Sequence, residues 1–433
     1  MEIAITIFYF ILFCFIINKL SFFDDDVISK KWFIGIFTIK VLVSILLTLI
    51  YTYYYTDRST ADIFKYFDDS KIMYGALKTN PLDFLKMLLG IANDSQYFNE
   101  TYYDNMRFWY SQGSTNLFTD SHTIIRFNTI VQFFSFGYFN VHNVFINFVS
   151  LIGLTAIFNL VKPYFKTCKK VLFYAIFLAP SVLFWGSGLL KESIIFFGLG
   201  LLLLYLKRIS ENFSWKSTLF ILIAILLITY TKLYVLAALS PALLGFGLNK
   251  TILKNKLFFS YLLSCLIIIS ASFLLLAAPL KINPIQLIIA KQHDFIELMN
   301  QVQNSSSFTF PIIQSTSDVI LAIPNALIAT FIRPFLWECN SPFMLMSAVE
   351  NLDIITFFIV ALFFRKKKIN YNLLLFCLSF VLFLYILTGL TVPNFGAIAR
   401  YKVPALPFLL IAILSIIDIE KLKTKFKFIA PFV

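Results

Sequence analysis

Long apolar runs separated by short polar turns dominate this 433-residue chain. The runs are continuously apolar rather than alternating, which predicts α-helices and not the strands of a membrane barrel. Inside a bilayer each backbone polar group must find its partner within the segment, and a helix of about 20 apolar residues meets that requirement. The pattern therefore predicts an all-α, polytopic transmembrane helical bundle of about 11–13 spans.

The positions of the apolar runs give the expected spans. They are Ile3–Ile17, Trp32–Tyr54, Val141–Val161, Val171–Trp185, Leu189–Leu206, Thr218–Tyr230, Leu233–Leu248, Leu257–Pro279, Pro342–Phe364, Tyr371–Leu387 and Pro404–Ile417. Two further stretches, Ile124–Tyr138 and Asp318–Phe335, each carry an arginine that would be costly at the bilayer centre. We expect these two to be re-entrant or interfacial. The first run lacks a basic leader and a small-residue cleavage site, so it is predicted to be a span rather than a signal peptide.

Basic clusters beside the spans set the expected orientation. They lie at Lys162–Lys170, Lys207–Arg208, Lys250–Lys256, Arg365–Lys368 and Lys421–Lys427. By the positive-inside rule, an outside N-terminus and a cytoplasmic C-terminus place all of them on the cytoplasmic face. Residues 1–433 then form a single integral membrane domain with two long outer loops, 56–121 and 281–340. We expect a bacterial-type inner (plasma) membrane.

Composition agrees with this class and narrows the function. The chain is 59% hydrophobic and 14% charged, with a mean hydropathy of +0.82, whereas soluble proteins lie near about 45–50% and 25%. The net charge of +13 is concentrated beside the spans, so no nucleic-acid partner is expected. The chain contains no P-loop, which argues against a nucleotide-driven pump. Membrane lipids are the expected surroundings.

The strongest local motif follows the second span, at the start of the first outer loop. Ser59 and Thr60 are candidate caps of a helix whose apolar residues recur at helical spacing, which predicts an amphipathic helix lying on the membrane. Asp62, Tyr66 and Asp69 share one face of this helix. The two carboxylates could bind a divalent cation, Mg²⁺ or Mn²⁺, or accept a proton from a hydroxyl. The alternative is an ordinary solvated polar face.

A second motif, Pro180–Glu192, lies between two apolar spans and ends in Lys191 and Glu192. A charge pair inside an apolar run is expensive unless it is used or mutually neutralised. The functional interpretation is a lysine that meets an anionic headgroup beneath the membrane surface. The structural interpretation is an ion pair bracing a hairpin.

Two later segments carry further candidates for contact with a lipid phosphate. Arg333 and Glu338 flank aromatic residues typical of the membrane interface. Asn394, Arg400 and Lys402 precede the last span, and arginine is suited to bidentate phosphate contact. The alternative for Arg400 is general snorkelling to headgroups, and we expect Lys402 to be a plain snorkelling residue.

With these motifs assembled, the chain resembles polytopic glycosyltransferases of the GT-C fold, which use lipid-linked sugars. Three features carry the resemblance: the acid-bearing helix Asp62–Asp69 after an early span, the proline-to-acid segment Pro180–Glu192, and the ending Arg400-Tyr-Lys-Val-Pro-Ala-Leu-Pro407. The last is similar to the R-Y-x-x-P-x-x-P run of mannosyl- and aminoarabinosyl-transferase relatives. A second acidic motif in a later outer loop is missing.

The resemblance implies inverting transfer of a sugar from a polyprenyl-phosphate-linked donor to a glycan, lipid or protein acceptor at the outer face. It implies Asp62 as base or metal-associated acid and Asp69 as a second acid. Lys191, Arg333 and Arg400 would hold the donor phosphate. Dependence on a divalent cation stays open.

Three other interpretations remain. The nearest is an outer-face polysaccharide polymerase or ligase of the O-antigen or capsule type, which Asn394–Arg400 also suits. A lipid-linked sugar flippase or transporter should show an inverted repeat or paired broken helices, and the sequence predicts neither. A scaffold of an envelope-assembly complex would use the outer charges as partner contacts.

Overall fold

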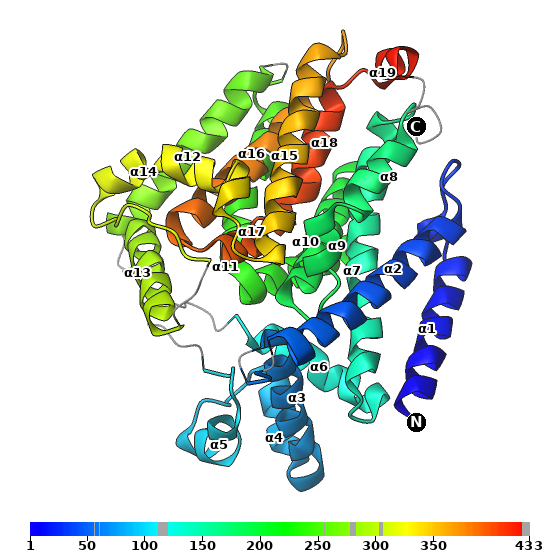
Figure 1. Cartoon of the computed structure of the whole chain (residues 1–433), viewed down its shortest axis with the longest axis vertical. Helices are drawn as coiled ribbons and strands as arrows, with labels where there is room; N and C mark the ends of the chain where they lie inside the picture. Colours follow the sequence, from blue (N-terminus) through cyan, green and yellow to red (C-terminus); the bar gives the residue numbers. More distant parts are fainter. Residues whose placement is uncertain are drawn as a thin grey trace. The chain divides into compact units, whose positions relative to one another are not determined.

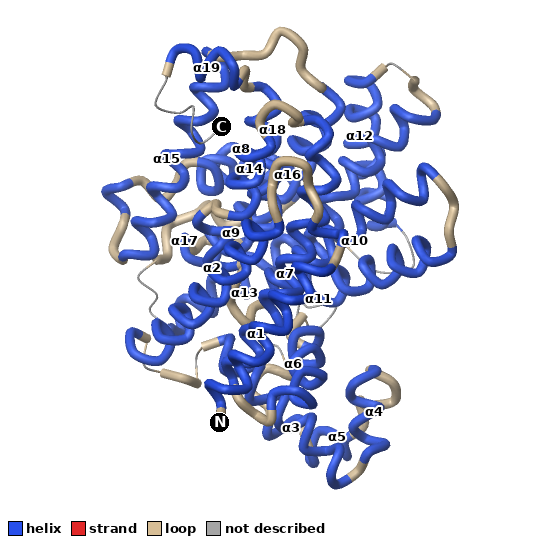
Figure 2. Tube along the Cα trace, turned by 90° about the vertical axis from the view of Figure 1, so that its right-hand side faces the viewer, coloured by secondary structure: helices blue, strands red, loops and turns tan. Residues whose placement is uncertain are grey.

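The computed structural model describes residues 1–55, 57–59, 61–110, 120–254, 256–277, 283–302 and 306–426. Almost all elements in these ranges are helices, as Figure 2 shows by their blue colour. Extended pairing in the described ranges is limited to two isolated bridges, Ser307 with Asn394 and Arg365 with Ile417. The all-α prediction is confirmed.

The chain divides into two compact units. Of the described residues, the first unit holds 1–110, 120–160 and 183–233, and the second holds 161–182 and 234–426. The sequence-predicted candidates divide accordingly: those of the first outer loop and the Pro180–Glu192 motif's charges fall in the first unit, and those after residue 330 fall in the second. Each unit is therefore described by itself.

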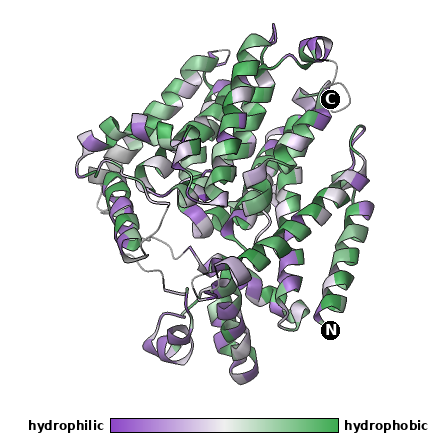
Figure 3. Cartoon of the chain, viewed as in Figure 1, coloured by the Kyte–Doolittle hydropathy of each residue, from purple (hydrophilic) through white to green (hydrophobic). Residues whose placement is uncertain are grey.

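The first unit combines long apolar helices with a polar loop region made of short helices. Its helices are α1 (Glu2–Lys19), α2 (Lys30–Leu49), α3 (Asp62–Thr79), α4 (Pro81–Leu89), α5 (Gln96–Thr101), α6 (His122–Ser135), α7 (Phe139–Val161), α10 (Lys191–Glu211) and the first part of α11 (Trp215–Thr251) (Figure 1). Figure 3 shows α1 and α2 as largely hydrophobic, whereas α5 is mostly hydrophilic.

Helix α3 occurs where the acid-bearing motif predicted it, but its surroundings differ from the prediction. Its apolar face is covered by protein: α3 packs along α6, and Phe64 and Phe67 contact Phe139 at the start of α7. The expectation that this face lies on the membrane is therefore wrong. The expected Ser59 cap is also wrong, since the residue at the cap position is Ala61; Thr60 lies outside the described residues.

Helices α7 and α10 approach each other closely where two glycines meet. A Cβ added to Gly200 would lie 2.2 Å from the backbone oxygen of Gly153, so no larger residue fits at this position. Small residues of this kind let membrane helices pack backbone to backbone. The contact fixes α10, whose first residue is Lys191, against the neighbouring span.

The second unit is a bundle built around α16. Its helices are α8 (Lys169–Phe177), the second part of α11, α12 (Leu257–Ala277), α13 (Pro284–Val302), α14 (Thr316–Phe331), α15 (Pro342–Phe363), α16 (Tyr371–Thr391), α17 (Phe395–Tyr401), α18 (Leu406–Ile416) and α19 (Ile419–Lys425). The short α9 (Pro180–Trp185) has residues in both units. Helix α16 packs on α14 and α18, and α18 in turn packs on α8 and α15.

Within the described residues, eight helices are long and apolar enough to cross a membrane, so the chain is a multi-pass membrane protein. These spans are Glu2–Lys19, Lys30–Tyr54, Phe139–Tyr164, Lys191–Glu211, Trp215–Thr251, Pro342–Phe363, Tyr371–Thr391 and Phe395–Ile416. Three of the eleven expected spans are not counted separately. The run Val171–Trp185 forms two short helices, and Leu257–Ala271 is too short to be counted. The expected spans Thr218–Tyr230 and Leu233–Leu248 are the two parts of α11, which is counted once although it is broken at Lys232.

Both breaks that the apolar pattern predicted, after Trp185 and after Tyr230, occur in the structure. Residues 186–190 separate α9 from α10, and α11 has non-helical torsion angles at Lys232, with φ −154° and ψ 85°. Both interruptions adjoin buried charged residues that are described below. The two doubtful stretches become α6 and α14, of 14 and 16 residues.

Candidate functional site

The first helical turn of α10 brings the second sequence motif to the acid-bearing helix α3. The ammonium of Lys191 forms an ion pair of 2.7 Å with Asp120, whose side chain is 39% exposed, whereas the lysine side chain is only 7% exposed. The same ammonium lies 5.6 Å from the centroid of the Tyr66 ring and 5.9 Å from that of Phe108. A lysine at the end of a span thus lies beside Tyr66 of α3 and beside an accessible carboxylate.

Asp69 binds the backbone of the loop that follows α5. Its two carboxylate oxygens accept hydrogen bonds of 2.8 Å from the backbone N–H groups of Arg107 and Phe108. Burial raises the pKa of Asp69, and the two amide donors only partly offset this effect. Because both oxygens are engaged, the carboxylate fixes the residues that cover Lys191.

Asp62 is the first residue of α3 and is partly exposed. It precedes Tyr66 by one helical turn, so it stands on the face that Tyr66 presents to Lys191. Of the two acids predicted for this helix, Asp62 has the more accessible carboxylate. Asp69 is only 1% exposed.

Glu192 and Lys191 do not pair with each other, contrary to the structural interpretation of the sequence. Glu192 forms an ion pair of 2.6 Å with Lys232, and the two side chains are 0% and 3% exposed. Lys232 is the residue at which α11 is interrupted. A buried pair of this kind is strongly destabilised when only one partner is removed, so Glu192 ties α10 to the α11 break.

The 186–190 segment that leads into Lys191 is held by polar groups from two spans. Lys40 of α2 donates to the carbonyl oxygen of Gly186 at 2.6 Å, and Ser150 of α7 donates to the same oxygen at 2.8 Å. Asn147 donates to the carbonyl oxygen of Ser187 at 2.9 Å. These bonds replace the helical ones that the interruption removes, as membrane burial requires.

Sequence reasoning missed Lys40, Asp120 and Lys232. Lys40 and Lys232 are isolated charges within apolar runs, and such residues are functional or structural markers by default. Reading the runs for single charges would have found both. No sequence pattern marks Asp120. It is a candidate only because the fold places it within 2.7 Å of Lys191.

A stack of rings closes the loop region beside this cluster. Trp109 lies between Tyr103 and His122, with ring centroids 4.5 and 3.6 Å away, and Arg126 lies over the same indole. The His122 ring also contacts the carbonyl oxygen of Trp109 at 2.8 Å. Burial lowers the pKa of His122 to about 4, so the ring is neutral at physiological pH.

In the second unit, Arg333 contacts residues of both predicted segments, the one that contains Glu338 and the one that begins at Asn394. Its guanidinium pairs with Glu338 and lies 4.6 and 4.9 Å from the ring centroids of Phe308 and Phe395. Burial raises the pKa of Glu338, but the bond from Arg333 and the Phe335 amide outweigh it and leave the pKa below its ordinary value. The pair is therefore ionised.

The remaining candidates of the second unit have mainly structural contacts. Asn394 caps α17 through the Ala397 amide and donates to Ser306. Lys402 is 2% exposed and donates to the carbonyl oxygen of Thr330 at 3.1 Å and to Asn351 at 2.5 Å. The expectation that Lys402 is a snorkelling residue is therefore wrong. Arg400 is partly exposed and lies on α17.

The residues suggested for a divalent cation do not fit one. Asp69 uses each oxygen for a backbone amide of the loop, which leaves Asp62 without a second carboxylate on that face. In the part of the chain that the structure describes, no group of three or more His, Cys, Asp or Glu side chains is arranged to hold a metal ion. We therefore derive no step that uses a metal.

The comparisons with known proteins add no family to this geometry. No family model matches the chain, and no curated protein or solved structure is detectably similar to it. The fold and the site therefore define a multi-pass, all-α membrane protein with charged residues grouped at the ends and interruptions of its spans.

Proposed function

We propose that this chain is a membrane glycosyltransferase of the GT-C type, which transfers a sugar from a polyprenyl-phosphate-linked donor to an envelope glycan, lipid or protein. The observation that carries the proposal is the position of Lys191. A cation at the first turn of a span stands where the phosphate of a membrane-anchored donor lies, and it is bordered by the carboxylate of Asp120 and the acid-bearing face of α3. Orientation with this face outside the cell follows the basic clusters.

In this proposal Lys191 binds the donor phosphate and exchanges its bond to Asp120 for one to a phosphate oxygen. Asp120 is 39% exposed, so it can turn to solvent when it is replaced. Charge-assisted bonds to phosphate are among the stronger ones available to a lysine. The nearby Tyr66 and Phe108 rings keep bulk water away from the ammonium and strengthen the contact.

Transfer then proceeds by a single inverting displacement. The acceptor hydroxyl gives its proton to the carboxylate of Asp62 as its oxygen bonds to the anomeric carbon of the sugar. The bond from that carbon to the phosphate oxygen breaks, and polyprenyl phosphate leaves with the electron pair. Lys191 stabilises the negative charge that develops on the leaving phosphate.

Purified full-length protein and radiolabelled polyprenyl-phosphate sugars test this proposal. Lys191→Met and Asp62→Asn should each reduce transfer at least about 100-fold, the range expected for loss of charge stabilisation or of a general base. Lys216→Met and Asp94→Asn, at exposed positions outside this cluster, are matched controls that should keep full activity. Full transfer by Asp62→Asn would refute the base assignment, and full transfer by Lys191→Met would refute the site.

A polysaccharide polymerase or ligase is the second candidate, and one observation favours it. The Arg333 guanidinium lies over Phe395, beside Asn394, so two separate segments converge on one arginine. An arginine between aromatic rings can hold a phosphate or a sugar ring. Sizing the products decides between the candidates: single additions support the transferase, and a ladder of lengths supports the polymerase.

A further inference from the structure

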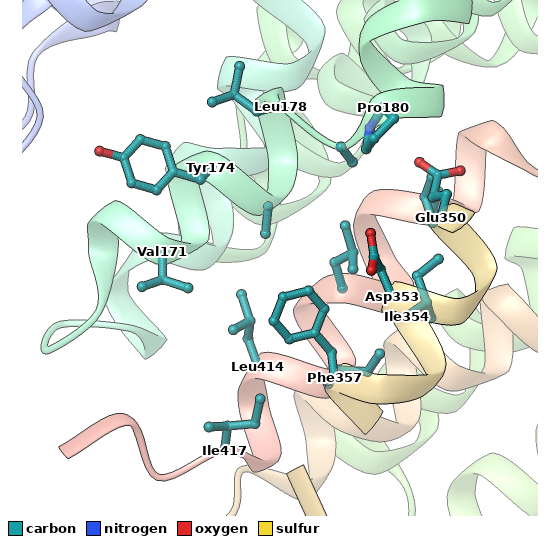
Figure 4. Close-up of a pocket in the computed structure, with 15 residues that line it drawn as sticks. Val171, Tyr174, Leu178, Pro180, Glu350, Asp353, Ile354, Phe357, Leu414 and Ile417 are labelled. Carbon is teal, nitrogen blue, oxygen red and sulfur yellow. The ribbon is translucent and has the colours of Figure 1, made fainter. Parts of the chain in front are cut away.

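A partly open cavity of about 310 Å³ lies within the second unit, between α8, α15 and α18. Figure 4 shows Tyr174 of α8 on one wall and Phe357 of α15 and Leu414 of α18 on the others. The lining is apolar except for Tyr174, Glu350 and Asp353. Its volume is at the lower end of the range of small-molecule sites, about 300–1,000 Å³. None of the residues named in the proposed transfer reaction lines it.

The Glu350 carboxylate is already satisfied by the protein. It accepts hydrogen bonds from the backbone N–H of Ser181, at 2.7 Å, and from the Ser181 hydroxyl. Lys402 also interacts with it electrostatically. Glu350 is 4% exposed, so it forms part of the wall and stabilises the turn that leads into α9.

Asp353 differs from Glu350 in each of these respects, and its side chain is exposed rather than buried. It makes no hydrogen bond or ion pair with any residue that the structure describes. All the residues that line the cavity belong to the described part of the chain, and none of them is basic. Figure 4 shows the Asp353 carboxylate extending from α15 toward the space that separates it from α8. The cavity therefore contains one carboxylate whose charge is not balanced by any residue that the structure describes.

The depth of Asp353 makes this imbalance costly. It lies 353 − 342 = 11 residues after Pro342, the first residue of the 22-residue α15, which is about 16 Å along the helix at 1.5 Å per residue. That is about half of a hydrocarbon core some 30 Å thick. An aspartate at this depth costs at least about 2.5–3.5 kcal/mol and marks a functional site by default.

We propose that this cavity is an intramembrane binding site for an amphiphilic amine, with the ammonium on Asp353 and the hydrocarbon chain along the walls of α8, α15 and α18. Charge complementarity selects the ammonium, because it balances the one uncompensated carboxylate. The apolar lining selects a hydrocarbon chain. A metal cation needs several oxygen ligands, and the second carboxylate is held by Ser181. This site is independent of the proposed sugar transfer.

Photo-crosslinking with two matched probes tests the proposal. Full-length protein in lipid nanodiscs is exposed to a diazirine-bearing dodecylamine or to the same probe with a hydroxyl in place of the amine, and the labelled peptides are mapped by mass spectrometry. We expect the amine to label α8, α15 and α18 at least about ten-fold more than the alcohol. Excess unlabelled dodecylamine should suppress this labelling.

Variants of Asp353 test the contribution of the carboxylate separately from that of the apolar walls. Asp353→Asn should reduce amine labelling of these helices to the level of the alcohol, while Asp353→Glu and the remote Asp94→Asn should keep it. Equal labelling by both probes in the wild type would overturn the proposal and leave a site for hydrocarbon chains only. Undiminished amine labelling in Asp353→Asn would also overturn it. If Asp353→Asn does not fold, the comparison of the two probes on wild-type protein still decides.

Discussion

Lys40 and Gly186 are joined by a hydrogen bond of 2.6 Å, from the lysine ammonium to the backbone carbonyl oxygen. Lys40 is 1% exposed and lies 40 − 30 = 10 residues from the start of α2, about 15 Å along the helix. It also donates to the Ser187 hydroxyl at 3.2 Å. A lysine at the middle of one span thus holds the break between α9 and α10, six residues before Glu192.

Replacement of Lys40 by Met should destabilise the first unit and disturb the position of Lys191. The Gly186 carbonyl would keep Ser150 as a donor but lose its charged partner, which costs about 1–3 kcal/mol for a buried group. Thermal unfolding of the purified protein measures the loss. The control is Lys31→Met, on the exposed first turn of the same helix, which should unfold like the wild type. If both variants unfold alike, the 186–190 segment does not depend on Lys40.

The losses of stability caused by replacing Glu192 and by replacing Lys232 should not add up in the double variant. Either single variant, Glu192→Gln or Lys232→Met, leaves one buried charge unpaired and should cost about 3–5 kcal/mol. The double variant should be more stable than either single one, because no unpaired charge remains. Denaturation of all four proteins completes the cycle. Purely additive losses would mean that the two side chains do not interact.

Asp69 should stabilise the loop at Arg107 and Phe108 rather than take part in a reaction. Asp69→Asn keeps the shape of the side chain but offers only one acceptor oxygen to the two amides of Arg107 and Phe108, so it should cost about 1–3 kcal/mol. Trypsin should then cleave faster after Arg107. Asp68→Asn is the matched control: it breaks only a surface pair with Arg58, which contributes little. Unchanged cleavage in Asp69→Asn would argue against this structural role.

The apolar pattern predicted the long helices well because burial in a membrane leaves few alternatives to a helix. It also predicted the breaks after Trp185 and Tyr230, but not the polar groups that satisfy the backbone at them. Lys40, Ser150 and Asn147 satisfy the backbone at 186–190 from other spans, and periodicity along one segment carries no information about such partners.

The candidate site was predicted only as separate motifs. Helical spacing placed Asp62, Tyr66 and Asp69 on one face, and the apolar run marked Lys191 as unusual. That Lys191 lies beside Tyr66 and pairs with Asp120 depends on how α3 and α10 pack. A sequence pattern states which residues share a face but not which element covers it, so Asp69 was mistaken for a free carboxylate.

His122 should make the protein less stable as the pH falls from about 6.5 to about 4. In the unfolded chain a histidine takes up a proton near pH 6.5, whereas burial lowers the pKa of His122 in the folded protein to about 4. Between these values the unfolded state binds more protons, so its free energy falls relative to the folded state. The loss approaches about 3 kcal/mol when the pH reaches about 4.

The unfolding temperature of the wild type and of His122→Gln, measured from pH 7.5 to pH 4.5, checks this sign. The variant should lose less stability over this interval, although it starts lower because its stacking on Trp109 is gone. Asp69, whose raised pKa acts in the opposite direction, is present in both proteins and cancels in the comparison. His293→Gln, at a residue whose side chain is 68% exposed, is the control and should follow the wild type. A wild-type curve parallel to that of His122→Gln would show that the ring is not buried as the Trp109 stack requires.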